Sequence, residues 1–431
     1  MQVKERIRLA ASSSRELEAL LAPVSPQEFV REYWAKKPLY VKGFKEKYQG
    51  FFDGAAFSAA LSAPGPVPSD FLRASFDRKS ADGTSATPSA PREALSTAFR
   101  AAPDQAVALF DAGATLCVAQ IETRVPSLQQ FVAAIKRQLS YPGKVSFNAY
   151  LSPPGSGFNW HFDGRIATTL QIEGTKRWRY SNEPTMPWPR ANGSIRADGV
   201  PQYADATVKA LPWERLAPLN PGDVAEVVLE PGDLLVLPAG TWHEACGGTG
   251  GSLALNLSFT PLSFTTLIAK LLDDQLVTDA QWRGPAPVLD AEGLEAIGAA
   301  LAKAGALLQS LRPDSAAVVR MWQQFVQSAN PVLPLAAKAP VPIAATQRFR
   351  VRDDVHAMAA ENATLLCLAF GPTGSMELSG AALPFVRRML AEREFAAGEC
   401  TAWNESGAPF AWSDVQAMLA DLRGGGLIEE A

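Results

Sequence analysis

The residue pattern that can do chemistry in this chain is His161-Phe162-Asp163, and the sequence holds only three histidines, His161, His243 and His356. Side chains at positions i and i+2 of a β-strand lie on one face, so His161 and Asp163 are predicted to point at one centre. His243, in PAGTWHEA, is the candidate third ligand. Two histidines and one carboxylate on a β scaffold are the ligand set of non-haem Fe(II) oxygenases, which leave positions open for a cosubstrate and O₂. A bare H-x-D also arises by chance, so the prediction needs support from its surroundings.

Lys176, in QIEGTKRW, lies thirteen residues beyond Asp163 and is predicted on the strand after the ligand strand. An ammonium group there could pair with the distal carboxylate of 2-oxoglutarate through a charge-assisted contact. The neighbouring Arg177 and Arg179 are interpreted as solvated surface residues. Lys176 could also belong to that solvated run, and its place beside the metal motif favours the cosubstrate role.

Other kinds of site find little support in the sequence. It contains no G-x-S-x-G nucleophile elbow, no Walker A loop and no G-x-G-x-x-G after a strand. Its four cysteines are far apart and include no C-x-x-C, which disfavours a zinc ribbon or a disulfide scaffold. His356 is interpreted as a surface or packing residue. Trp160, Trp178 and Trp242 are expected to form pocket walls or core.

The elements that must position these residues are short strands. From about 114 to 260, apolar runs such as VSFNAYL, TTLQIE, DLLVLP and LALNLSF alternate with turns rich in Pro, Gly and Asp, a pattern typical of a sandwich or barrel. Pro-Gly-Asp occurs at 221–223 and at 231–233, and the two triplets are predicted to bracket one strand. Before this region, Ser25 is predicted to cap a helix, LYVKG (39–43) to form a strand, and 62–92 to be a long loop.

The second half of the chain is expected to be mostly helical. Residues 262–328 carry apolar side chains at i, i+3, i+4 and i+7, and 337–345 is interpreted as a linker. The tail is predicted to open with a strand at LLCLAF and to continue as helix, turn, helix and strand, with Ser413 capping the second helix. That order is compatible with a winged-helix-like module.

The segment 148–180, NAYLSPPGSGFNWHFDGRIATTLQIEGTKRWRY, resembles the JmjC/cupin-like family of Fe(II)/2-oxoglutarate oxygenases, and within it the ribosomal-oxygenase group of protein hydroxylases. FVREYWAKKPLYVKG (29–43), LPAGTWHEA and ALNLSFTP extend the resemblance. It implies an α+β fold with a double-stranded β-helix (jelly roll) core, a helical region that dimerises, and the winged-helix-like tail. It also implies iron ligation by His161, Asp163 and His243, with Fe(II) as the metal and 2-oxoglutarate and O₂ as cosubstrates. The cosubstrate positions that it matches are Lys176, Asn148, Tyr150, Thr169, Asn256 and Ser258.

The chain departs from this group shortly after H-x-D. Many ribosomal oxygenases have an acidic residue and then an aromatic residue there, where this chain has Ile166 and Thr168. The substrate therefore stays open. The leading expectation is a protein or peptide side chain, and the resemblance implies a ribosomal protein as one such substrate. The alternatives are a small metabolite or natural product, a demethylation, or metal binding in a cupin without turnover.

The composition sets the remaining bounds. The 431 residues are 47% hydrophobic and 19% charged, with 40 Lys+Arg against 44 Asp+Glu. This slight acidic excess does not indicate binding to nucleic acid or to an anionic membrane. We expect an N-terminal helical lead-in (1–60), a jelly-roll catalytic domain (61–261), a helical and dimerising region (262–336) and the tail (346–431). Unpaired cysteines, the absence of a signal-like leader and the absence of a long apolar run predict a cytoplasmic protein without a membrane span. The tail holds seven arginines, no lysine and twelve acids from 341 onward, so it is not expected to bind nucleic acid.

Overall fold

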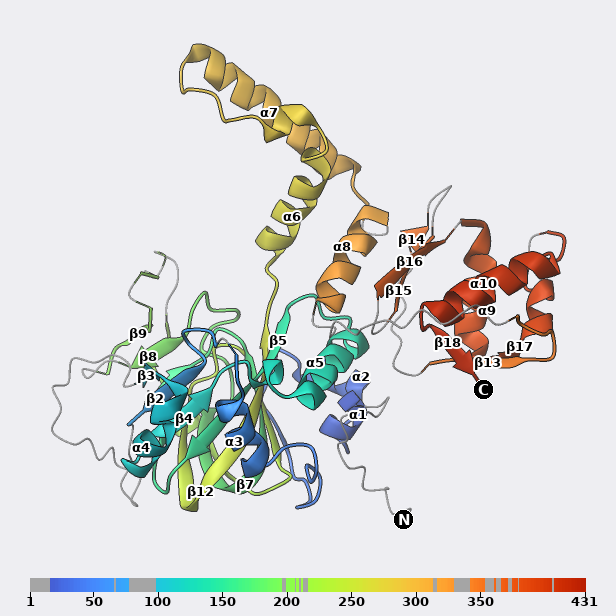
Figure 1. The fold of residues 1–431 in the computed structure, drawn as a ribbon. Coiled ribbons are helices and arrows are strands. Elements are labelled where there is room, and N and C mark those ends of the chain that lie inside the picture. Colours follow the sequence, from blue (N-terminus) through green and yellow to red (C-terminus); the bar gives the residue numbers. More distant parts are fainter. Residues whose placement is uncertain are drawn as a thin grey trace. The chain divides into compact units, whose positions relative to one another are not determined.

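A computed structural model describes residues 16–65, 67–76, 98–195, 199–205, 207–208, 211, 216–312, 316–328, 342–352, 360–361, 366–370, 374–378, 380–404 and 407–431. Contacts divide the chain into two compact units. Unit 1 comprises 1–135 and 144–260, and unit 2 comprises 136–143 and 261–431 (Figure 1).

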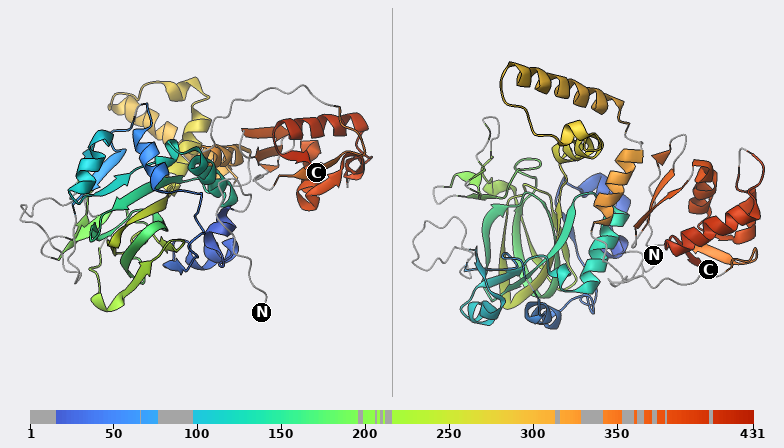
Figure 2. Two further views of the ribbon diagram at one scale, coloured as in Figure 1. Left: turned by 60° about the horizontal axis from the view of Figure 1, so that its bottom comes forward. Right: turned by 45° about the horizontal axis from the view of Figure 1, so that its top comes forward.

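Unit 1 is built around a large antiparallel sheet in the order β1-β11-β7-β12-β5-β4-β2-β3, with β10 added to β7, and with β6, β8 and β9 continuing from β12. The sheet curls back on itself in both views of Figure 2. The jelly-roll core of an α+β fold is therefore confirmed. Its strands are β1 (Leu39–Val41), β2 (Leu72–Ser75), β3 (Ala98–Ala101), β4 (Thr115–Val118), β5 (Lys144–Ser152), β6 (Gly157–Phe162), β7 (Ile166–Ser181), β8 (Gly193–Ile195), β9 (Pro201–Tyr203), β10 (Val224–Leu229), β11 (Leu234–Leu237) and β12 (His243–Thr260).

Two long strands, β7 and β12, pair over 243–247 and 252–259 of β12 and hold the roll together. The first half of β7 also pairs with β11 and the second half with β10, while β12 pairs with β6 near its start and with β5 near its end. Both strands bend where the register shifts between Gly247 and Ser252. At this bend Gly174 has a φ of +64°, and a β-carbon on it would lie 2.2 Å from the carbonyl oxygen of Gly251. Only glycine fits such a close approach in the left-handed region.

Helices and short turns complete unit 1. Ser25 accepts a hydrogen bond from the backbone N–H of Glu28, as the predicted helix cap requires, although the helix passes into a π-helical turn at Phe29. The predicted loop at 62–92 is wrong in part, because β2 lies inside it and pairs with β3 and β4. The helical elements are α1 (Glu16–Leu21), α2 (Pro26–Glu28), η1 (Phe29–Tyr33), α3 (Gly54–Ser62), η2 (Pro103–Gln105), α4 (Ala106–Asp111), η3 (Ile121–Thr123), α5 (Pro126–Gln138, which runs on into unit 2) and η4 (Pro221–Asp223).

The two Pro-Gly-Asp turns do bracket a strand, β10, as expected. The second turn is tied down by Asp233, whose buried carboxylate accepts hydrogen bonds from the backbone N–H groups of Gly43 (2.9 Å) and Glu230 (3.0 Å). This aspartate thereby joins the N-terminal segment to the strand that follows it.

Unit 2 begins with helices and ends with a small α+β module. The helices are α6 (Phe264–Leu276), η5 (Ala280–Arg283), α7 (Ala291–Ser310) and α8 (Ala316–Gln327). The module contains β13 (Arg348–Val351), β14 (Ala360–Glu361), β15 (Leu366–Phe370), β16 (Gly374–Leu378), η6 (Gly380–Ala382), α9 (Leu383–Glu392), β17 (Glu394–Ala396), η7 (Ala397–Ala402), α10 (Trp412–Gly424) and β18 (Ile428–Glu430).

The tail differs from the sequence expectation at two points. It opens with β13, not with the strand at LLCLAF, and β13 is the central strand of the sheet β17-β13-β18. The alternating pattern of Arg348-Phe349-Arg350-Val351 is the signal that was missed. Ser413 is not the cap of α10, because the helix starts one residue earlier, after the extended Ala411. The winged-helix-like character of the tail stays a prediction.

Candidate metal centre

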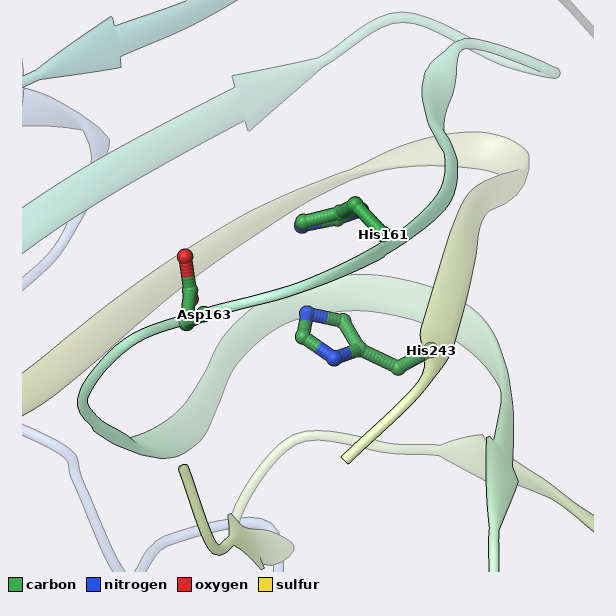
Figure 3. Close-up of side chains that lie close together, drawn as sticks. All are labelled: His161, Asp163 and His243. Atoms are coloured by element: carbon green, nitrogen blue, oxygen red, sulfur yellow. The ribbon is translucent and has the colours of Figure 1, made fainter. Parts of the chain in front are cut away.

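The three predicted ligands meet at one point of unit 1. One ligand atom each from His161, Asp163 and His243 lies within 4.8 Å of the other two, and within the described part of the chain this is the group suited to hold a metal ion. Figure 3 shows the three side chains converging. His161 is on β6, Asp163 follows the end of that strand at Phe162, and His243 begins β12.

Strand pairing brings the distant histidine to the motif. His243 is the register partner of His161 in the pairing of β12 with β6, and the two imidazole rings are 4.2 Å apart, centroid to centroid. The turn before β12 holds the indole of Trp242, which is 1% exposed and packs against Phe162 and Tyr203. The expectation that Trp242 is core is met, and this packing fixes the start of the ligand strand.

Both histidines are held in the tautomer that metal binding requires. Nδ1 of His161 lies 2.6 Å from the carbonyl oxygen of Asn159, and Nδ1 of His243 lies 2.8 Å from that of Thr241. A carbonyl oxygen can only accept, so each Nδ1 donates and each Nε2 lone pair is left free. The two Nε2 atoms and a carboxylate oxygen form a donor set that suits Fe(II).

The charges around the centre favour metal binding. Desolvation lowers the pKa of His243 to about 3, so this ring is neutral near pH 7. Burial alone would raise the pKa of Asp163, but Arg165 and the two histidines outweigh burial and the pKa is lowered. Asp163 is therefore a carboxylate, the form that binds a cation.

Lys176 lies inside the roll and is 2% exposed. Its Nζ is 3.4 Å from Oγ of Ser152 and 5.6 to 5.9 Å from the ring centres of Tyr150, Phe158 and Trp178. Desolvation lowers the pKa of this ammonium to about 8. The solvated alternative for Lys176 is therefore wrong. No carboxylate forms an ion pair with it among the described residues, which makes it a buried cation without a counter-ion.

The remaining candidate cosubstrate residues form a buried polar row across β5, β12 and β7. Asn256 is in register with Asn148 on one side and Thr169 on the other, and its Nδ2 lies 3.4 Å from Oγ1 of Thr169. Ser258 donates to Oδ1 of Asn256 at 2.7 Å. Thr169 was expected on the ligand strand or its continuation, but it lies on β7, the strand after it.

Sequence reasoning missed two arginines beside the centre. Arg165 follows Asp163 by two residues, and its guanidinium lies 3.9 Å from Oδ1 of Asp163. Arg73, on β2, also acts electrostatically on Asp163 and lowers its pKa. An arginine so close to H-x-D was a local signal that could have been read, whereas Arg73 reaches the centre only through the pairing of β2 with β4. His356 lies outside the described residues.

Parts of this chain are similar in sequence to known proteins. Residues 123–267 match the JmjC domain family. YxbC of Bacillus subtilis (strain 168) is 26% identical over 284 residues, which is 64% of this chain and 80% of that protein. Ribosomal oxygenase 1 of Gallus gallus is 31% identical over 258 residues, 59% of this chain and 38% of that protein, so the chain spans well under half of this relative.

A solved structure of YcfD, described as a ribosomal oxygenase from Escherichia coli, superimposes with a TM-score of 0.46 at 14% identity. The superposition covers 95% of this chain and 98% of that one.

Proposed function

We propose that this chain, in which residues 123–267 form a JmjC domain, is an Fe(II)- and 2-oxoglutarate-dependent dioxygenase that hydroxylates a protein or peptide side chain. The observation that carries the proposal is that one roll holds both the two-histidine, one-aspartate centre and Lys176. Lys176 is a buried ammonium that lacks a counter-ion among the described residues. A buried charge is costly unless it is paired. The distal carboxylate of 2-oxoglutarate would supply the missing partner.

Each residue has a task in this reaction. His161, Asp163 and His243 would hold the iron, and the main-chain carbonyls behind the two histidines keep their Nε2 atoms aimed at it. Lys176 would hold the far end of 2-oxoglutarate, while the rings around it keep water away from the ion pair. Fe(II), when bound, supplies the chemistry that couples oxidative decarboxylation of 2-oxoglutarate by O₂, to succinate and CO₂, with insertion of the other oxygen atom into a C–H bond.

The polar row would line the same pocket. Asn148, Asn256, Thr169 and Ser258 are all buried and lie on neighbouring strands of the roll. Tyr150, beside Lys176, would contribute its hydroxyl. Burial raises the pKa of this tyrosine, so it stays a neutral hydrogen-bond donor.

A protein substrate is favoured by the relative named ribosomal oxygenase 1. The second candidate, a small-molecule oxygenase of the same chemistry, is favoured by Ile166 and Thr168, which are 1% and 2% exposed and remove the acidic and aromatic positions of that group. Demethylation would use the same iron and cosubstrate. A cupin that binds metal without turnover is the remaining alternative.

The test is succinate formation with Fe(II), 2-oxoglutarate and O₂. Turnover, even without a substrate, excludes the non-catalytic alternative, and its absence with fully loaded protein contradicts the proposal. Mass spectrometry on a peptide panel then separates hydroxylation, a gain of one oxygen, from demethylation. If no peptide of the panel is modified but a metabolite is, the small-molecule candidate is favoured.

The assembly is proposed to be a two-fold dimer formed through α6 and α7. These helices leave large apolar side chains in water: Phe264 is 84%, Leu301 69% and Leu294 59% exposed. Soluble monomers rarely leave so much apolar surface uncovered, and a second copy of the same face is its simplest cover.

The tail is proposed to contact protein and not nucleic acid. Four of its arginines are ion-paired: Arg348 with Glu394 at 2.9 Å, and likewise Arg350, Arg388 and Arg423 with neighbouring glutamates. Arginines whose charge is neutralised by a glutamate contribute less to binding the phosphates of a nucleic acid.

No helix in the described part of the chain has the length and apolar character needed to cross a membrane. A cytoplasmic location is proposed from the thiols, since Cys117, Cys246 and Cys400 are all unpaired.

A further inference from the structure

Two arginines near the metal centre have hydrogen-bonding capacity that the described residues do not use. Nε of Arg73 and Nε of Arg165 are both buried and have no hydrogen-bond partner there. Arg73 also donates to the sulfur of Cys117 at 3.4 Å, a weak acceptor, and Arg165 stands 3.9 Å from Asp163, beyond hydrogen-bond distance. Buried donors are nearly always satisfied in native proteins, so a missing acceptor has to be accounted for.

The two guanidinium groups act on the same residues beside the metal centre. Each acts electrostatically on Asp163 and on Tyr150, and Arg73 acts on Arg165. The register from β2 through β4 to β5 places Arg73, Cys117 and Tyr150 in one row. Like charges on one region repel each other, which is tolerated where an anion binds between or beside them.

The charge balance of the site with Fe(II) and 2-oxoglutarate bound indicates whether the anion at the arginines belongs to the cosubstrate or to the substrate. Fe(II) and Lys176 carry three positive charges, and Asp163 and 2-oxoglutarate carry three negative charges, so the two arginines are surplus. Asp70 also acts on Arg73 and offsets one of these two charges, so the excess is one positive charge, that of Arg165. The position that is acidic in many ribosomal oxygenases is Ile166 here, directly after Arg165. That position therefore carries no negative charge here, and the residue before it is positively charged.

We infer that the substrate carries a carboxylate close to the oxidised carbon, as an aspartate or glutamate side chain of a peptide does, and that Arg165, assisted by Arg73, binds it. This inference rests on the proposed function for its reaction, but the anion site is a property of the arginines themselves. Arg165 contributes a planar pair of donors that fits a carboxylate, which a lysine would not provide.

The experiment uses the full chain and three pools of short peptides with random flanks that differ at one central position: Glu, Gln or Arg. Succinate formation is measured with Fe(II), 2-oxoglutarate and O₂, and stimulation over the peptide-free rate is compared between pools. We expect the Glu pool to stimulate about tenfold more than the Gln pool, the usual size of one charge-assisted contact. Comparing pools within one variant cancels changes in its peptide-free rate.

The variants assign the effect to its residue. Arg165→Gln should bring the Glu-to-Gln ratio to about one, while Arg31→Gln, the same change at an exposed arginine outside the site, should leave it at the wild-type value. A preference of the wild type for the Arg pool overturns the inference, as does an unchanged ratio in Arg165→Gln. The inference is also overturned if Arg165→Gln keeps the wild-type Glu-to-Gln ratio but needs as much more 2-oxoglutarate as Lys176→Ala does. The arginine would then bind the cosubstrate.

A binding measurement separates this inference from the proposed function. The Glu and Gln pools are labelled with a fluorophore and their binding to metal-free protein is measured. The protein should retain more of the Glu pool than of the Gln pool, and rising salt should reduce the difference in retention. Absence of succinate from loaded wild-type protein refutes the oxygenase and leaves the binding result to decide the anion site; equal retention of both pools refutes the anion site. N-Acetylglutamate and N-acetylglutamine, tested in the same assay, show whether a free small molecule can supply the carboxylate in place of a peptide.

Discussion

Removal of the Lys176 amine is expected to abolish tight binding of 2-oxoglutarate and to stabilise the protein in its absence. The ammonium is 2% exposed and has only Oγ of Ser152, at 3.4 Å, as a polar contact within hydrogen-bond range among the described residues. Burial holds its pKa at about 8 against an ordinary 10.5. Below pH 8 the fold therefore bears the cost of a poorly compensated buried charge.

The size of both effects follows from these values. A hydrogen bond to a charged group contributes roughly 1.5–3 kcal/mol, which is about 10- to 150-fold in affinity. Lys176→Ala should raise the dissociation constant of 2-oxoglutarate by that factor while metal affinity changes far less. The fall of the pKa from 10.5 to about 8 corresponds to a desolvation cost of about 3 kcal/mol in the empty fold, as an upper bound. Lys176→Met, which keeps the packing, should therefore leave the empty protein as stable or more stable.

The pH dependence has a definite sign. The cosubstrate selects the charged amine, so its affinity should fall about tenfold per pH unit above pH 8, where the empty protein loses that proton. The stability of the empty protein should instead rise between pH 8 and 10.5, because the unfolded chain binds the proton more tightly there. Lys176→Met should show neither trend.

The assay is calorimetric titration of 2-oxoglutarate into Mn(II)-loaded protein, with thermal unfolding of the empty protein beside it. Lys37→Ala, at an exposed lysine, is the matched control. Wild-type affinity in Lys176→Ala would mean that another group holds the carboxylate. A large loss of stability in Lys176→Met would mean that the amine has an acceptor in the fold besides Oγ of Ser152.

Three further outcomes are expected. Asp163→Ala should lose Co(II) binding, measured by the visible absorption of the metal, while its circular dichroism stays near that of the wild type. Asp163→Glu should also bind Co(II) poorly, since about an ångström of displacement matters in a preorganised site. Wild-type absorption in either variant would contradict the ligand assignment. Light scattering at micromolar concentration should give the mass of two chains, and Leu301→Glu, on the exposed face of α7, should reduce it to one; a wild-type monomer would remove the dimer. A gel shift with duplex DNA at about 100 mM salt should show no binding by the full chain, and a salt-sensitive complex that needs Arg387 and Arg388 would reopen a nucleic-acid role for the tail.

The sequence was informative where neighbours in the chain are also neighbours in space. His161 and Asp163 could be paired from their spacing, and the turns around β10 could be recognised from their residues. His243 could be assigned only through the resemblance and the scarcity of histidines, because it reaches the centre by the pairing of β12 with β6.

What the sequence could not reveal depends on environment. Whether Lys176 is solvated or buried is decided by the curvature that encloses the second half of β7, and no local pattern encodes it. The role of Arg73 requires two successive strand pairings. Ser413 was a poor guide because a serine inside the first turn of a helix looks the same in sequence as a cap. The small tail sheet was missed because its central strand is only four residues long.

The acceptors behind the two histidines have a consequence for how this site can evolve. Both are main-chain carbonyls, at Asn159 and Thr241, each two residues before its histidine. Where a carboxylate side chain does this work, one substitution can release the imidazole. Here almost any amino acid at 159 or 241 would present the same oxygen, so mutational drift at these positions leaves the tautomers unchanged. The pocket walls can therefore diversify toward new substrates while the metal-holding rings keep their orientation.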